Sequence, residues 1–174
     1  MIRIRPYALS DAPSLFEAVR ESIDTMSAWL PWCHEGYSFE ESEVWVKSQV
    51  QAFKEGSEYA FVILSESERF LGGCGLNALD LANARANLGY WVRASARGQG
   101  IATEATRLLI QWAFQNTPFH RLEILAATGN GASLRVAEKV GGHREGLLRD
   151  RIRVRDQVQD GVLFSVLRTD PRAL

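Results

Sequence analysis

The stretch Arg97-Gly98-Gln99-Gly100-Ile101-Ala102 constrains the fold of this chain more than any other, because it joins a strand-like segment at 88–92 to a strongly amphipathic helix. Glycines let the backbone turn tightly, and the first amide N–H groups of a helix have no partner inside it. These amides lie at the positive end of the helix dipole, beside the charge of Arg97. The turn therefore suits either a bound phosphate or diphosphate, or a simple tight connection.

Two common phosphate motifs do not fit this turn. It lacks the Gly-Lys-Ser/Thr of a P-loop, and no third glycine is placed for a dinucleotide fingerprint. The sequence therefore gives poor support to a nucleoside triphosphate or NAD. A nucleotide-binding protein that uses the same loop stays an alternative, and thermal protection by ATP or NAD but not by CoA would indicate it.

Hydrophobic periodicity predicts the elements before the turn. Ser38 and Glu41 form a capping-box pattern that predicts a helix start. Apolar segments at 59–64, 71–79 and 88–92 are separated by polar turns, which favours an antiparallel meander.

The second half of the chain predicts a crossover unit followed by a hairpin. The helix after Gly100 carries a continuous apolar stripe, and the buried strand expected at 122–127 would run parallel to the strand before the helix. Another helix is expected after Asn130 and Gly131. The last segments, at 152–155 and 158–167, predict a hairpin with its turn near Asp156.

Bulk properties exclude several classes of protein. The chain has 174 residues, 46% of them hydrophobic, which predicts a single domain over residues 1–174. Its net charge of -1 gives no general attraction to nucleic acid or to an anionic membrane. Cys33 and Cys74 lack metal-site spacing, so we expect reduced thiols and no metal. With no secretory signal and no membrane-spanning run, we expect a cytoplasmic protein.

The segment at 87–105 resembles the acyl-CoA diphosphate loop of the GNAT superfamily of N-acetyltransferases. The family pattern is Arg/Gln-x-x-Gly-x-Gly/Ala, matched here by Arg97, Gly100 and Ala102. The RimJ/RimL-like branch, which contains ribosomal-protein-alanine and ribosomal-protein-serine acetyltransferases, is the most similar. Its further motifs correspond here to Gly89-Tyr90-Trp91-Val92, Trp29-Leu30-Pro31-Trp32, Asn130-Gly131-Ala132-Ser133, Glu138-Lys139-x-Gly141 and Glu145-Gly146.

The resemblance implies a fold and a reaction. The fold is α+β (mixed α/β) of GNAT type: a central twisted mixed sheet of about seven strands, splayed between strands 4 and 5 and flanked by about four helices. The reaction is acetyl transfer from acetyl-CoA to a primary amine by direct attack on the thioester. Peptide N-terminal α-amines come first among acceptors. Small amines such as polyamines or amine antibiotics, a succinyl donor, a non-catalytic CoA-binding regulatory module and a homodimer remain open.

The resemblance also assigns residues to the cofactor side. It implies that the main-chain amides of Arg97, Gly98, Gln99, Gly100, Ile101, Ala102 and Thr103 hold the diphosphate. An N–H group near Trp91 or Val92 would face the thioester oxygen. Asn130 would bind the pantetheine arm and Ser133 the sulfur, as proton donor, since the tyrosine that many relatives carry on this helix is missing. Asn130 and Ser133 also suit a plain helix cap.

The acceptor side is less defined. Many relatives carry a glutamate where this chain has Asn87, so Glu35 and His34 are the alternative bases. An α-amine acceptor needs no strong base, because its own pKa lies near ~7.7 to 8.0. Trp29, Trp32 and His34 are the expected acceptor-binding residues. Aromatic residues of this kind also suit the core, and a histidine beside tryptophan also suits a loop contact.

Overall fold

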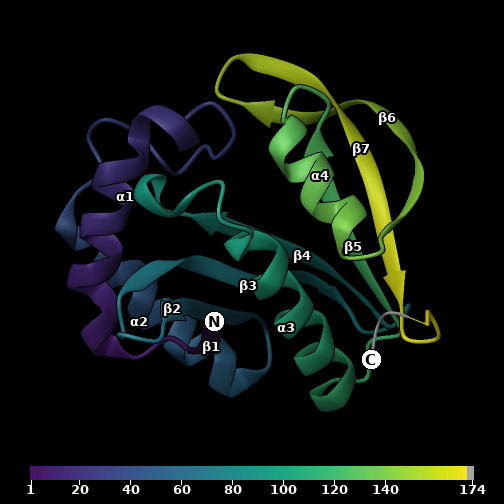
Figure 1. Ribbon diagram of the computed structural model, residues 1–174, viewed down its shortest axis with the longest axis horizontal. Coiled ribbons are helices and arrows are strands. Elements are labelled where there is room, and N and C mark those ends of the chain that lie inside the picture. The colour runs from purple at the N-terminus through teal and green to yellow at the C-terminus, as the bar shows by residue number, and fades with distance from the viewer. Residues whose placement is uncertain (172–174) are drawn as a thin grey trace.

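The computed structural model describes residues 1–171 and shows the mixed α/β architecture that the sequence predicts (Figure 1). The last three residues of the predicted domain, 172–174, lie outside the described residues. In chain order the elements are β1 (Ile2–Pro6), α1 (Ala12–Met26), α2 (Phe39–Glu55), β2 (Tyr59–Ser65), β3 (Phe70–Asp80), β4 (Arg85–Val92), α3 (Ile101–Asn116), β5 (Arg121–Ala127), α4 (Gly131–Lys139), β6 (His143–Val154) and β7 (Gln157–Leu167).

The strands form one mixed sheet in the order β1-β2-β3-β4-β5-β7-β6. All neighbours pair antiparallel except β4 and β5, which are parallel and joined by α3, as the crossover pattern predicts. The β4–β5 pairing starts at Arg85 and Arg121 and ends at Asn87 and Glu123, although β4 continues to Val92. The predicted splay between strands 4 and 5 is therefore confirmed.

Two cores hold the helices against the sheet. The first lies between α3, α4 and the sheet and includes Leu109, Phe119 and Phe164. The second lies under α1 and α2 and includes Val19 and Val46. Figure 1 shows α1 and α2 together on one side of the molecule and α4 beside β5 and β7. None of the helices in residues 1–171 is long and apolar enough to cross a membrane.

The first turn of α2 is fixed by the capping box that the sequence predicts. The Glu41 amide donates to the Ser38 hydroxyl (3.2 Å), and the Ser38 amide donates to the Glu41 carboxylate (2.8 Å). Each bond satisfies a backbone donor that the helix itself leaves free. The helix therefore begins at a defined residue, next to the loop that carries Trp32 and His34.

Replacing Ser38 by alanine should lower the free energy of unfolding by about 1 kcal/mol, because the Glu41 amide loses its acceptor. Urea denaturation followed by tryptophan fluorescence measures this change. Ser48→Ala is the control, since this exposed hydroxyl in the same helix donates to the Trp45 carbonyl, and its removal should cost less than about 0.5 kcal/mol. Equal losses in the two variants would contradict the capping role.

The C-terminal hairpin has the predicted turn but a longer first strand. Val154 pairs with Gln157, so the turn lies at Arg155 and Asp156. The pairing extends back to His143, opposite Ser165, whereas the sequence pattern indicated only the segment from residue 152. Exposed arginines interrupt the apolar pattern of β6, so the sequence pattern did not predict the first part of this strand.

Candidate active site

The turn before α3 presents free backbone donors. Gly98 and Gly100 adopt φ values of 76° and 79°, in the left-handed region that glycine populates without strain. The Glu104 amide donates to the Gly100 carbonyl (3.0 Å) and is the first amide that α3 itself uses. The preceding amides of the first helical turn are left for another acceptor, at the positive end of the helix dipole. The turn thus has the geometry of an anion site.

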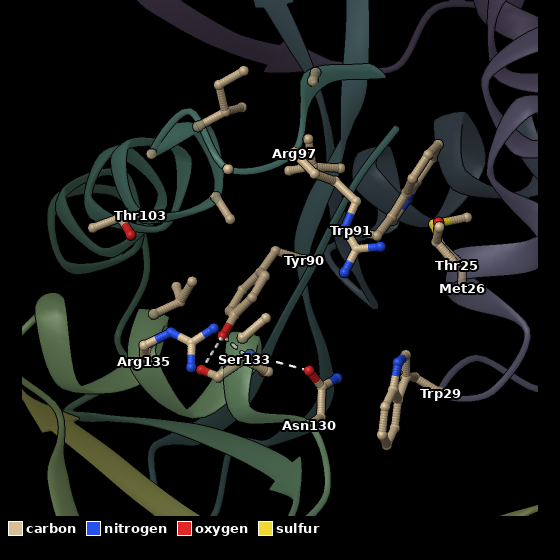
Figure 2. A pocket seen from close by; sticks show the side chains of 18 of the residues that line it. Thr25, Met26, Trp29, Tyr90, Trp91, Arg97, Thr103, Asn130, Ser133 and Arg135 are labelled. Carbon is tan, nitrogen blue, oxygen red and sulfur yellow. Dashed lines mark hydrogen bonds between the residues drawn. The ribbon is translucent and has the colours of Figure 1, made fainter. Parts of the chain in front are cut away.

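A cleft of about 350 Å³ opens beside this turn, between α3, α4 and the end of α1 (Figure 2). The cationic side chains of Arg97, Arg135 and Lys139 line it, and among the described residues no carboxylate does. Figure 2 shows Arg97 extending into the cleft and Arg135 on the far side, by Ser133. The cleft therefore favours an elongated anionic ligand whose charge rests on the turn.

An ion-pair network ties the segment before the turn to α1. The Arg93 guanidinium, with only 5% of its side chain exposed, donates to Glu21 through Nε (2.9 Å) and to Glu17 (2.8 Å). The Glu21 carboxylate also accepts from the Ser95 amide (2.7 Å). The Arg93 hydrogen bonds are the largest cause of the lowering of the pKa of Glu21 to about 2. Arg93 and Glu21 therefore fix the position from which the chain enters the turn.

A tyrosine hydroxyl meets the predicted serine inside the cleft. The hydroxyl oxygens of Tyr90 and Ser133 lie 3.0 Å apart (Figure 2), and the Ser133 amide donates to the Asn130 side chain (3.1 Å). Asn130 thus caps α4 and orients Ser133 at its start. Burial raises the pKa of Tyr90, opposed by its bond to Ser133, so the phenol stays protonated at neutral pH. The Tyr90 hydroxyl can donate either to the Ser133 carbonyl (3.1 Å) or to the Ser133 hydroxyl, and in the second orientation the pair is a chain of hydroxyl groups able to deliver a proton into the cleft.

The splay leaves backbone amides of β4 without a strand partner. The Arg93 amide donates to the Leu71 carbonyl of β3 (2.8 Å), and Trp91 is paired with Gly73 of β3. Because successive amides of a strand point to opposite sides, the Val92 amide points away from β3, toward the side that β5 has left. Of the two predicted donors for the thioester oxygen, Val92 has the suitable orientation.

A second cavity of about 930 Å³ lies on the sheet under α2. Three glycines, Gly73, Gly75 and Gly89, line it, and Gly75 pairs with Gly89 across β3 and β4. A Cβ built on Gly89 would meet nothing within 4 Å, so the missing side chain contributes open space. Leu30, Tyr90 and Trp91 line both this cavity and the first cleft, which therefore meet at β4.

The structure brings most of the predicted residues together. The predicted residues that line the first cleft are Trp29, Trp91, Val92, Arg97, Gly98, Gly100, Ile101, Ala102, Thr103, Asn130 and Ser133. Trp32 and His34 line the second cavity, where the His34 Nε2 lies 3.0 Å from a Glu41 carboxylate oxygen. Trp29, expected on the acceptor side, thus lies in the cleft beside the turn instead.

Two predicted residues, Glu35 and Gln99, do not line either cavity. Glu35 is exposed, and its carbonyl accepts from Arg20 of α1. Gln99, predicted to contribute its main-chain amide, is not part of the cleft lining, and its side-chain amide donates to the Ser95 carbonyl (3.3 Å). Asn87, at the position where a base was sought, donates to Asn77 (2.8 Å), a residue of the second cavity. His34 is therefore the better placed of the two candidate bases.

Sequence reasoning missed the side chains of Tyr90, Arg135 and Lys139. Tyr90 was considered only for its backbone, as part of the splayed strand. Arg135 and Lys139 are four positions apart in the sequence and so lie on one face of α4. That spacing, next to the predicted diphosphate loop, is the signal that identifies them.

Comparisons with known proteins find matches over most of this chain. The family model described as acetyltransferase (GNAT) domain matches residues 2–143. The ribosomal-protein-serine acetyltransferase of Escherichia coli (strain K12) is 26% identical over 94% of this chain and 91% of its own. Among solved structures, RimL, a ribosomal L7/L12 α-N-protein acetyltransferase in complex with coenzyme A, superposes with a TM-score of 0.89 at 23% identity, covering 95% of this chain and 93% of that one.

The microcin C7 self-immunity acetyltransferase MccE, solved with acetyl-CoA and AMP, superposes with a TM-score of 0.89 at 22% identity. The alignment covers 95% of this chain and 92% of that one. At this level of identity, both structures establish the likeness of the fold.

Proposed function

This chain belongs to the GNAT acetyltransferase family, and we propose that it transfers an acetyl group from acetyl-CoA to the free α-amine of a peptide. The observation that carries the proposal is the meeting of two cavities at Tyr90 and Trp91, one with a free-amide turn and cationic walls, the other able to admit an acceptor. The E. coli relative is named as a ribosomal-protein-serine acetyltransferase, which supports a peptide amine as acceptor.

In this proposal the first cleft holds the donor. The amides at the start of α3 and the side chains of Arg97, Arg135 and Lys139 neutralise the diphosphate and phosphate charges of acetyl-CoA. The Val92 amide donates to the thioester oxygen as negative charge grows on it. The structures of RimL with coenzyme A and of MccE with acetyl-CoA support this donor.

The acceptor amine would attack from the second cavity. Its nitrogen forms a bond to the acetyl carbon, the carbon–sulfur bond breaks, and the amine loses a proton. His34, paired with Glu41, accepts that proton, because imidazole is suited to proton transfer near neutral pH. As the carbon–sulfur bond breaks, Ser133 donates its proton to the sulfur and takes one from the Tyr90 hydroxyl, and solvent entering the open cleft returns a proton to Tyr90.

Direct transfer suits this site better than an acyl-cysteine intermediate. Cys33 and Cys74 are both free and buried. Burial raises the pKa of each thiol, so neither forms the thiolate that a nucleophile needs.

Two measurements test the proposal. Calorimetry measures the binding of CoA and acetyl-CoA, and release of free thiol measures transfer to a panel of peptides and small amines. Turnover with peptides supports it. Turnover with small amines but not with peptides would show that the acceptor is a small amine. Turnover with succinyl-CoA but not with acetyl-CoA would show that the donor is succinyl-CoA. Tight CoA binding without any transfer indicates a regulatory CoA-binding module, and no CoA binding contradicts the proposal altogether.

Ala102→Glu should weaken CoA binding by at least about tenfold, because it places a carboxylate among the amides proposed to hold the diphosphate. Ala102 lines the cleft in the first turn of α3. A glutamate at a helix N-terminus interacts favourably with the dipole, so the melting temperature should not fall. Ala102→Gln, matched in size but neutral, separates charge from bulk. Equal CoA affinity in the glutamate and glutamine variants would contradict the diphosphate site.

A further inference from the structure

The second cavity carries charge of the opposite sign to the cleft beside it. Glu40, Glu41 and Glu58 line it, and within residues 1–171 no lysine or arginine does. The bond from the Ser38 amide is the largest cause of a lowered pKa for Glu41, so this carboxyl stays ionised. Aromatic walls, including Trp32 and Trp45, add surfaces over which cations bind. The cavity therefore favours a positively charged occupant and opposes an acidic one.

Glu58 is the carboxylate best placed to contact an occupant. It is half-buried just before β2, and one of its oxygens accepts from the Gln49 side chain (3.1 Å). Gln49 is itself buried, so this bond holds the carboxylate in a defined orientation. Its other oxygen accepts no hydrogen bond from the described residues. Glu41, by contrast, uses both oxygens, on Ser38 and His34.

A second feature of the cavity points to an oxygen on the occupant. Tyr7 lines it with only 6% exposure, and its buried hydroxyl has no hydrogen-bond partner in residues 1–171. The hydroxyl oxygen and the Trp91 indole nitrogen each lie 2.8 Å from where a Cβ of Gly73 would stand. Glycine at this position therefore lets both hydrogen-bond donors approach the strand, where a side chain would collide with them. An orphaned buried hydroxyl is costly unless something accepts from it.

We infer that the acceptor is the N-terminus of a peptide with a basic side chain close to its free amine. This inference rests on the proposed function and specifies its substrate. A peptide carbonyl oxygen accepts from Tyr7 and Trp91, and the lysine or arginine side chain pairs with Glu58. The volume of about 930 Å³ is at the upper end of the range for ligand sites, enough for a few residues. An oxygen-free polyamine satisfies the carboxylates but leaves the two donors unpaired.

Matched acceptors test the inference with the full chain and saturating acetyl-CoA. Three tetrapeptide amides differ only at the second position, which is lysine, glutamine or glutamate, and spermidine serves as the oxygen-free cation. We expect kcat/KM for the lysine peptide to exceed that for the glutamate peptide by about tenfold or more, with glutamine between. Added salt should shrink this preference, because charge pairs that solvent reaches are screened.

Variants identify the groups that recognise the peptide. Glu58→Gln should reduce the lysine-to-glutamate ratio several-fold. Glu55→Gln should leave the ratio unchanged, since Glu55 is exposed at the end of α2 and lies outside the cavity lining. Tyr7→Phe should lower kcat/KM for all peptides without lowering the melting temperature, because no internal hydrogen bond is lost.

The outcomes separate this inference from the proposed function. Peptide turnover with equal kcat/KM for the lysine and glutamate peptides overturns the charge preference but leaves the acetyltransferase proposal intact. If the lysine-to-glutamate ratio of kcat/KM is equal in the Glu58→Gln and Glu55→Gln variants, the role of Glu58 is overturned and the acetyltransferase proposal is left intact. Spermidine turnover above that of every peptide overturns the peptide assignment. Absence of transfer to any acceptor, with CoA bound, rejects the proposed function and the inference with it.

Discussion

Tyr90→Phe is expected to lower kcat about 100-fold while leaving the dissociation constant of CoA nearly unchanged. The substitution keeps the ring, which packs against the core beside α4, and removes the hydroxyl 3.0 Å from that of Ser133. Without it Ser133 has no internal source from which to recover the proton it gives to sulfur. The expected effect lies at the low end for general acids, because a thiolate is a stable leaving group.

A double-mutant cycle checks whether the two hydroxyl groups act as one unit. Ser133→Ala should lower kcat by a similar factor, and the double variant should be little worse than either single variant. Ser165→Ala is the control, since its buried hydroxyl on β7 donates to Glu145, away from both cavities. Full kcat in both single variants would reject the proton route. Multiplying losses would show that the hydroxyls act separately.

Glu21→Gln is expected to lower the free energy of unfolding by about 2 to 3 kcal/mol, because it removes the main charge partner of a nearly buried guanidinium. The loss should be smaller than for a fully buried pair, since Arg93 keeps Glu17 and the Phe70 carbonyl. The variant should also bind CoA more weakly, because Glu21 holds the Ser95 amide just before the turn. Urea denaturation and calorimetry measure the two effects.

Glu21 also makes the free energy of unfolding depend on pH in the acid range. The pKa of Glu21 falls from its usual 4.5 to about 2 in the folded chain, so the carboxylate stabilises the fold fully above pH 4.5. That contribution is lost as the pH falls from about 4.5 to about 2, because the unfolded chain then binds the proton more readily. The difference in stability between the wild-type chain and the Glu21→Gln variant should therefore shrink over this window.

Glu17→Gln provides the matched control. Glu17 contacts the same guanidinium but has 71% of its side chain exposed, so its removal should cost less than about 1 kcal/mol. If both variants lose the same stability, the guanidinium has no preferred partner, and the anchoring role of Glu21 is wrong.

The sequence predicted the fold well because its local patterns are strong. The capping box at Ser38 and Glu41, the apolar stripe of α3 and the glycine turn at Gly98 and Gly100 each depend on neighbours in sequence. The start of β6 was missed because it pairs with β7 while exposing a polar face. Periodicity does not reveal an edge strand of that kind.

Much of the site depends on contacts between distant elements. The Tyr90 hydroxyl reaches Ser133 because β4 and α4 approach across the splay, 43 residues apart in the chain. Trp29 lies in the cleft beside the turn and Glu35 turns to solvent because of the path of one loop, which the motif there does not specify. The second cavity is lined by residues of α2, β3 and β4, and sequence alone does not show that these residues lie close together.

The two cavities overlap at Leu30, Tyr90 and Trp91, and the rest of each lining belongs to it alone among the described residues. If the two cavities bind acceptor and donor as proposed, a substitution in the part of α2 that lines the second cavity changes acceptor binding and leaves the donor site unchanged. Duplicated genes for such a chain can therefore acquire new acceptors by successive substitutions, while each variant still binds the acetyl donor. Because the two cavities meet at β4 and are otherwise lined by different residues, the acceptor specificity of this fold can change readily during evolution.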